Sequence, residues 1–194
     1  MRRHVNTLIF ALALAAAFAA PAVAGGNANF ILGSRTMSSG DDWEPFESQV
    51  LFGANVDFGK EGWPIQMVAG VHASVDAETA FGVDLTATIT ELSFGVSKIW
   101  KVGKNTRPHI GGGAAMVTAA LEAELGSFGS TSVDDSSPGF YVDGGVYWRL
   151  GRRFNIGVDA RVMLGTDIEF YGIKGDANYT QIGLLLGWGW PAGK

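Results

Sequence analysis

One short stretch of the sequence carries residue types that could do chemistry together. His72 and Ser74 are separated by a single alanine, and residues two apart on a β-strand share a face. A histidine placed in this way could accept the serine proton and make the hydroxyl a nucleophile, with Asp76, Glu78 or Asp84 as an acidic third member. The alternative interpretation is a hydrogen-bonded pair in a polar interior. Because a three-residue match is loose, His72 and Ser74 are weak catalytic candidates.

Other chemical motifs do not stand out. The sequence contains no phosphate-binding glycine loop before a helix, no metal-ligand cluster and no nucleophile elbow. The run from Gly111 to Gly113 lies inside an expected strand, which favours close packing of strands over nucleotide binding. We expect His72 and His109 near opposite ends of their strands, too far apart to share a metal. The sequence therefore predicts no metal, no cofactor and no enzymatic activity.

The elements that must position these residues are strands, because apolar residues recur at every second position. In one segment the apolar residues are Val50, Phe52, Ala54, Val56 and Phe58, and the alternate residues are Leu51, Gly53, Asn55 and Asp57. This period of two is typical of a strand with one apolar face. The same alternation occurs in 65–75, 140–150, 154–164 and 180–190. Less regular segments at 27–36, 83–100 and 107–121 bring the expected count to eight strands.

The segment 83–100 changes phase between Ile89 and Leu92. Two explanations remain open. A β-bulge would shift the alternation by one residue. Alternatively, the outer half of the strand projects beyond a membrane, where alternation is not enforced.

The beginning of the chain predicts export. Arg2 and Arg3 precede an apolar stretch from Leu8 to Ala20, and small residues follow up to Ala24. This is typical of a signal peptide at 1–24, cleaved after Ala24 and leaving one domain over 25–194. An exported chain without cysteine has no disulfides to stabilise it. The formal net charge is -5, and nothing in it suggests a nucleic-acid partner.

The composition of the polar face decides which way the strands face. The polar face of the strands carries only a few charged residues, whereas a soluble surface is about a quarter or more charged. A polar face of mostly Gly, Ser, Thr, Asn and Tyr suits a narrow barrel interior, with the apolar face against lipid. We expect a paired polar network in this lumen, formed by Glu91, Asp143, Arg149, Asp159 and Arg161. A soluble lipocalin-like carrier, with its apolar face inward around a ligand, is the alternative.

Loop lengths and charges predict an orientation. We expect short inner turns at 59–62, 102–106 and 151–153, and longer outer loops at 38–45, 122–137 and 167–177, with a shorter outer link at 76–81. Cations cluster at the inner turns: Lys60, Lys101, Lys104, Arg107, Arg152 and Arg153. Carboxylates cluster on the outer side: Asp41, Asp42, Glu44, Glu47, Glu122, Glu124, Asp134, Asp135, Asp167, Glu169 and Asp176. The acidic rim either attracts divalent cations or cationic surface partners, or simply solvates the protein.

Over 25–190 this pattern resembles the small eight-stranded outer-membrane β-barrels of the OmpA/OmpX type. The last segment resembles the terminal signal that assembly machinery reads, through Gln181, Gly183, Leu186, Trp188 and Trp190. The resemblance implies an all-β, antiparallel, up-and-down transmembrane barrel in the outer membrane of a Gram-negative cell envelope. It also implies as partners outer-membrane lipid and lipopolysaccharide, and during biogenesis the barrel-assembly machinery and periplasmic chaperones. We expect a monomer.

The expected role is structural or one of surface interaction, with a plugged polar lumen and acidic extracellular loops. Two alternatives remain. Lipid A deacylases are outer-membrane barrels with a His-x-Ser pair, which His72 and Ser74 would supply. A small-solute, porin-like pore is the other, although the lumen of an eight-stranded barrel is just wide enough for side chains to fill.

Overall fold

The computed structural model describes residues 25–38, 43–60, 62–80, 83–124, 129–170 and 173–191. The predicted signal peptide, 1–24, lies outside the described residues. The strands are β1 (Gly25–Met37), β2 (Ser48–Gly59), β3 (Gln66–Ala80), β4 (Val83–Ile99), β5 (Thr106–Glu124), β6 (Ser130–Leu150), β7 (Phe154–Leu164), β8 (Asp167–Phe170), β9 (Ile173–Asp176) and β10 (Tyr179–Trp190). Among these residues no helix is long and apolar enough to cross a membrane.

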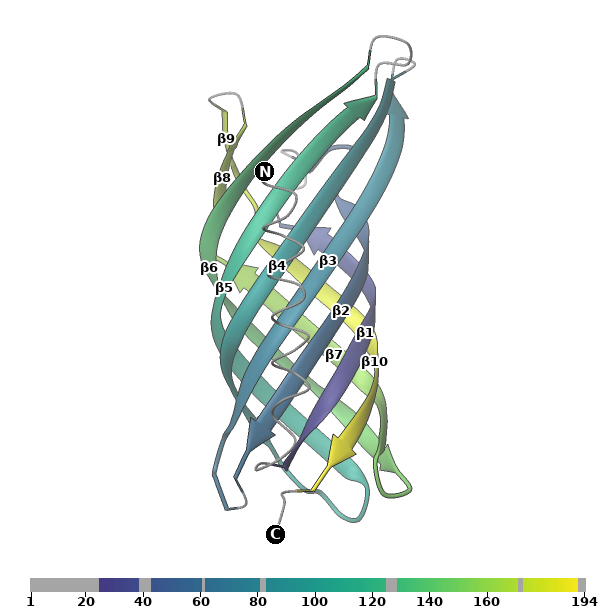
Figure 1. Cartoon of the computed structure of the whole chain (residues 1–194), viewed down its shortest axis with the longest axis vertical. Coiled ribbons are helices and arrows are strands. Elements are labelled where there is room, and N and C mark those ends of the chain that lie inside the picture. Colours follow the sequence, from purple (N-terminus) through teal and green to yellow (C-terminus); the bar gives the residue numbers. More distant parts are fainter. Residues whose placement is uncertain are drawn as a thin grey trace.

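Eight of the strands form a closed barrel in the order β1-β10-β7-β6-β5-β4-β3-β2 (Figure 1). Neighbouring strands are antiparallel, and β1 closes the barrel by pairing with β10 from Gly26↔Trp190 to Met37↔Tyr179. The remaining two strands, β8 and β9, form a separate hairpin between β7 and β10. The predicted fold class, an up-and-down antiparallel barrel of eight strands, is confirmed.

The alternation of side chains matches the predicted parity. Outward-facing apolar residues are strongly exposed, with Phe30 at 67%, Phe140 at 71% and Leu184 at 62%. Inward-facing polar residues such as Gln49 and Gln181 are buried. A closed barrel satisfies its backbone hydrogen bonds within its wall, so an apolar outer band of this kind is stable against lipid. The soluble carrier alternative, with the apolar face inward, does not fit this surface.

The strand β4 is unbroken where the sequence alternation changes phase: the same positions continue to face inward, but the inward residues become apolar and the outward ones polar. The pairing of β4 with β3 runs residue for residue from Gln66↔Ser97 to Ala80↔Val83. The β-bulge alternative is therefore wrong. On the outer half of β4 the buried residues include Ala87 and Ile89, while the threonines between and beside them face outward. This reversal of apolar and polar positions fits the second explanation, in which the outer half of β4 projects beyond the membrane. An outward face that meets water there does not have to be apolar.

Three segments predicted as outer connections are largely strands. Residues 76–80 of the predicted link 76–81 belong to β3. Most of 122–137 extends the β5–β6 hairpin as far as Glu124↔Ser130, and 167–177 contains the β8–β9 hairpin. Their sequences lack period-two alternation because both faces of these projecting strands are polar or mixed. Of the inner turns, 151–153 is as predicted, with Gly151 at a φ of 63°. The other two are longer than predicted, because β3 begins at Gln66 and β4 ends at Ile99.

Candidate functional site

The lumen has a polar layer centred on Arg161 of β7. Its Nη1 donates to Glu91 Oε1 of β4 at 2.5 Å, and its Nη2 donates to Asp143 Oδ2 of β6 at 2.9 Å. Arg161 and Glu91 are fully buried, and Asp143 is nearly so. Alternation along three strands turns these side chains inward, and closure of the barrel brings them together.

A second arginine also lies close to the Glu91 carboxylate. Arg35 of β1 lies 3.6 Å from Glu91 Oε2 through its Nη2, which also donates to Gln181 Oε1 at 3.1 Å. The Arg35 guanidinium stacks 3.9 Å above the Tyr179 ring, and the Tyr179 hydroxyl donates to Glu91 Oε2 at 2.5 Å. Buried charges are tolerated when they are paired and hydrogen-bonded. Here two arginines face the carboxylates of Glu91 and Asp143, so the charges of the layer balance.

Not all the predicted lumen residues lie in this network. Glu91, Asp143 and Arg161 are directly connected. Asp159 Oδ2 instead accepts a hydrogen bond from His109 Nε2 at 2.9 Å. Arg149, nearer the inner end, donates to Asn155 Oδ1 at 3.0 Å and also contacts Asn27.

The predicted polar network did not include Arg35, Tyr179, Gln181 or His109. For Arg35 the sequence did contain a signal, because alternation along the segment 27–36 places this residue on the same face as Asn27 and Asn29. Tyr179 was placed on the polar face of the last strand, but its pairing with Glu91 was not predicted. Gln181 was interpreted as an assembly signal, and its inward side chain is bound to Arg35.

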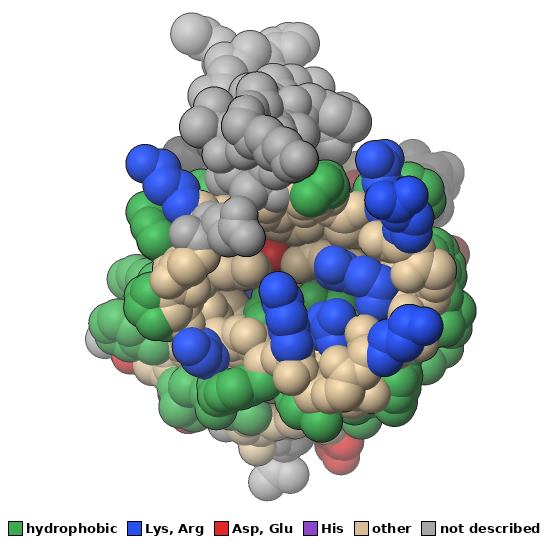
Figure 2. Space-filling view, turned by 90° about the horizontal axis from the view of Figure 1, so that it is seen from below, with side chains coloured by type: hydrophobic (Ala, Val, Ile, Leu, Met, Phe, Trp, Pro, Cys, Tyr) green, Lys and Arg blue, Asp and Glu red, His purple; other side chains and the backbone are tan. Residues whose placement is uncertain are grey.

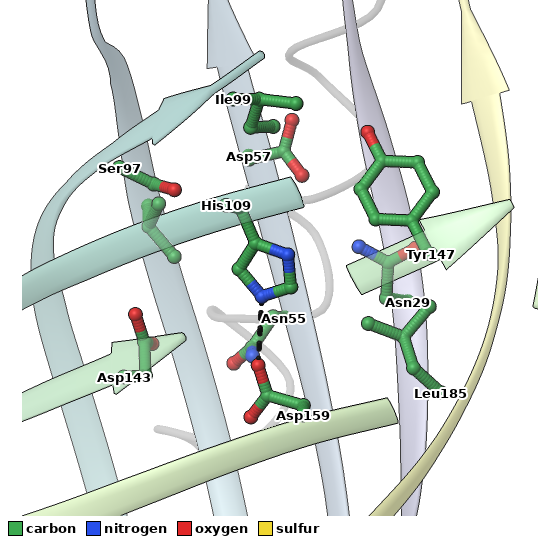
Figure 3. Close-up of a pocket in the computed structure, with 11 residues that line it drawn as sticks. Asn29, Asn55, Asp57, Ser97, Ile99, His109, Asp143, Tyr147, Asp159 and Leu185 are labelled. Carbon is green, nitrogen blue, oxygen red and sulfur yellow. Dashed lines mark hydrogen bonds and ion pairs between the residues drawn. The ribbon is translucent and has the colours of Figure 1, made fainter. Parts of the chain in front are cut away.

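Below the polar layer is a small cavity of about 30 Å³ (Figure 3). Its polar lining includes Asn29, Asn55, Asp57, His109 and Asp159. Figure 3 shows the His109 ring pointing into this space, with its Nε2 joined to Asp159. The space is enough for only one or two water molecules. Among the described residues no group of three or more His, Asp or Glu side chains is placed to hold a metal ion.

The outer end of the lumen is apolar. A cluster of buried residues, here called the outer plug, consists of Met37, Trp43, Ile89, Ala115, Val117, Ala119, Tyr141, Met163, Ile168, Ala177 and Tyr179. Trp43 comes from the β1–β2 connection, and its Nε1 donates to the Asp176 carbonyl oxygen of β9 at 2.7 Å. The outer plug thus joins the first outer loop to the β8–β9 hairpin and covers the polar layer.

His72 and Ser74 both face the lumen, but they do not form a proton relay. Ser74 Oγ donates to Gln49 Oε1 at 2.6 Å. His72 Nδ1 lies 3.1 Å from Arg161 Nη1 and 3.5 Å from Glu91 Oε1, and His72 Nε2 has no hydrogen-bond partner among the described residues. Both side chains are buried. The serine proton is therefore engaged by an amide oxygen, and this geometry gives the hydrolase alternative no support.

Glycines make room for the network. A Cβ atom at Gly53 would overlap the His72 ring, and one at Gly111 would overlap the Asp143 carboxylate. Gly111 therefore serves close packing, as predicted for the glycine run. Each of these glycines is paired with its large partner on the adjacent strand, Gly53 with His72 and Gly111 with Asp143. The absence of a glycine side chain leaves space for the larger one.

Comparison with known proteins rests on structure. No family model matches the chain, and no curated protein matches it by sequence. Among solved structures, the attachment invasion locus protein Ail of Yersinia pestis, in complex with the heparin analogue sucrose octasulfate, is similar at 12% identity and a TM-score of 0.58, over 87% of this chain and 99% of Ail. The chain has the fold of the small eight-stranded outer-membrane barrels.

Two further outer-membrane barrels support this result. Neisserial surface protein A is 10% identical, with a TM-score of 0.57 over 85% of this chain and 96% of that protein. The N-terminal barrel domain of Pseudomonas aeruginosa OprF is also 10% identical, with a TM-score of 0.52 over 86% of this chain and 99% of that domain. The predicted resemblance is confirmed at the level of fold, and an apolar outer band agrees with the predicted outer-membrane location.

The predicted assembly signal lies on the strand that closes this outer-membrane barrel. In β10, Leu186 and Trp188 face outward, while Gln181 is buried in the lumen. Gly183 is paired with Gly33 of β1, and a Cβ atom at Gly183 would overlap the Ile31 side chain. Recognition of these residues by assembly machinery stays a prediction.

Proposed function

We propose that this protein is a monomeric, integral outer-membrane barrel that presents a surface-interaction platform and conducts no solutes. The observation that carries the proposal is the filled lumen. The paired polar layer around Arg161 occupies the middle, and the outer plug covers it with apolar side chains. An eight-stranded barrel leaves little interior space beyond that filled by side chains.

The orientation follows from the two unlike ends of the barrel. The turn at 151–153 lies at the same end as Gly25 and Trp190, and we assign this end to the periplasmic side because short turns face the periplasm in such barrels. At the other end β3, β4, β5 and β6 extend beyond the rest of the wall (Figure 1). We assign this extension to the extracellular side. There, Thr118 and Ser136 face outward and are hydrogen-bonded to each other.

The platform carries an acidic groove of about 570 Å³ beside the extension. Its lining includes Glu44, Glu47, Asp76 and Glu78. None of these four carboxylates forms an ion pair with another described residue. The structure of Ail contains the heparin analogue sucrose octasulfate, which is an anion. The negative charge of the groove in this protein would repel a ligand of that kind. Complementary potentials favour association, so the proposed partner is a cationic surface or peptide.

Lipid and biogenesis partners belong to the same proposal. The apolar outer band contacts outer-membrane lipid, and the projecting strands lie at the level of the lipopolysaccharide headgroups. The final strand, β10, carries the residues that resemble the signal read by the barrel-assembly machinery, with periplasmic chaperones delivering the chain.

Planar-bilayer recording tests the closed lumen. We expect the folded protein to show no large, steady conductance, because water-filled passage would require both the polar layer and the outer plug to open. Outer-membrane fractionation and heat-modifiable migration on a detergent gel establish that the inserted protein is folded. A large, steady conductance from such a sample would contradict the proposal and support the pore alternative.

Binding of an oligolysine peptide tests the acidic groove. The combined substitutions Glu44→Gln, Glu47→Gln and Glu78→Gln are expected to weaken binding to the folded barrel in neutral detergent by about tenfold at low salt. The matched control removes the same number of outer carboxylates elsewhere, through Glu122→Gln, Asp134→Asn and Glu169→Gln. Equal loss in both variants, measured by fluorescence anisotropy, would mean that the general charge of the rim is responsible and the groove is not.

A further inference from the structure

The inner end of the barrel carries a ring of exposed cations. We call it the inner collar and define it as Lys60, Lys101, Lys104, Arg152 and Arg153. Seen from the inner end, basic side chains surround the mouth of the barrel (Figure 2). Within the described part of the chain, none of the five forms an ion pair. Among the described residues, the collar is therefore a positive surface without ion-pair partners.

An exposed tryptophan lies in or close to each inner turn. Trp63 lies in the β2–β3 turn, Trp100 directly follows β4, and Trp148 is near the end of β6. All three are close to half exposed. Tryptophan rings of this kind favour the interface between lipid and water. The collar cations are thus held at the depth of lipid headgroups.

One contact places a collar cation on the lipid-facing wall itself. The Arg153 guanidinium lies 5.8 Å from the centre of the Trp188 ring. Trp188 is 52% exposed on the outside of β10. A cation over an outward-facing aromatic ring is directed toward the membrane interface and away from the mouth of the lumen. This favours a lipid over a soluble periplasmic polyanion as the group that neutralises the collar.

We propose that the inner collar binds the phosphate headgroups of anionic phospholipids in the inner leaflet. Basic residues beside a bilayer attract anionic lipids, and this attraction falls within a Debye length. The opposite end of the barrel has the acidic groove, so the molecule is polarised across the membrane. The collar thus gives the protein a preference for anionic lipid, a property that goes beyond the proposed surface-interaction role. Binding of these lipids fixes the depth and the orientation of the barrel in the membrane.

Lipid selectivity in vesicles tests this inference. The folded barrel is inserted into phosphatidylcholine vesicles that contain spin-labelled phosphatidylglycerol or spin-labelled phosphatidylcholine, and the motionally restricted fraction of each label is measured. We expect a selectivity for phosphatidylglycerol of about twofold or more at low salt, falling toward one at about 1 M salt. Neutralising all five collar residues to glutamine is expected to abolish it.

A charge-retaining variant provides the matched control. Lys60→Arg, Lys101→Arg and Lys104→Arg together keep the positive charge and should keep the selectivity. If the five-residue variant fails to fold, the pairs Lys101→Gln with Lys104→Gln and Arg152→Gln with Arg153→Gln should each remove part of it. Full selectivity in the neutralised variants would overturn the proposal. Loss of selectivity on adding millimolar inorganic phosphate, at constant ionic strength, would overturn it in favour of a free-anion site.

Discussion

Replacing Glu91 with glutamine is expected to lower the free energy of unfolding by about 3–5 kcal/mol. Glu91 Oε1 accepts from Arg161 and Oε2 accepts from Tyr179, while Arg35 lies 3.6 Å away. Glutamine keeps the volume of the side chain but removes the negative charge. Asp143 alone would then face two buried guanidinium groups. The loss arises because breaking a buried ion pair leaves a charge without compensation.

Equilibrium unfolding in urea, from lipid vesicles and followed by tryptophan fluorescence, measures this effect. The matched control is Glu122→Gln, which makes the same chemical change on the exposed, projecting part of β5. That variant is expected to stay within about 0.5 kcal/mol of the unsubstituted protein. If the two variants lost equal stability, the network around Glu91 would not be what stabilises the barrel.

Replacing Trp43 with alanine is the second large expected loss, again of about 3–5 kcal/mol. Trp43 is 9% exposed and packs in the outer plug. Its removal leaves a cavity among apolar side chains and also removes the hydrogen bond to the Asp176 carbonyl oxygen. The β8–β9 hairpin should therefore loosen from the first outer loop.

Trp63→Ala is the control, because Trp63 is 50% exposed and belongs to an inner turn. Its effect on the free energy of unfolding should be clearly smaller. Limited proteolysis of the folded barrel gives an independent readout, since only Trp43→Ala is expected to speed cleavage within 165–178. Unchanged cleavage together with unchanged stability would show that Trp43 does not hold the outer plug.

Most of the fold could be predicted because lipid and a closed wall impose a simple rule on each strand. In β7 and β10 every second residue faces lipid, so the alternation is complete and the limits of both strands are readable from the sequence. The projecting parts of β4, β5 and β6 escape this rule. Their outward faces meet water, so Thr88 can face outward while Ile89 faces inward. Sequence reasoning accordingly mistook the outer ends of β5 and β6 for a loop.

The candidate site was less predictable for a different reason. Parity indicates that Glu91, Asp143 and Arg161 face inward, but it contains no information on the stagger between strands. Arg35 and Glu91 come from β1 and β4, which are not neighbours in the wall. Their contact across the lumen depends on the tilt and closure of the whole barrel. The same geometry brings Asp159 into hydrogen-bond contact with His109, and Arg149 into hydrogen-bond contact with Asn155.

In the regularly alternating strands, the sequence by itself determined which residues face lipid and which face the lumen, because a period of two is a local property of the extended chain. It also determined the contrast between a basic inner end and an acidic outer end, since charge follows the turns and loops in which it lies. The tertiary structure decided which inward residues pair, that Trp43 and the β8–β9 hairpin cover the lumen, and that His72 and Ser74 have different partners. Those contacts join residues distant along the chain, and closure of the wall brings them together.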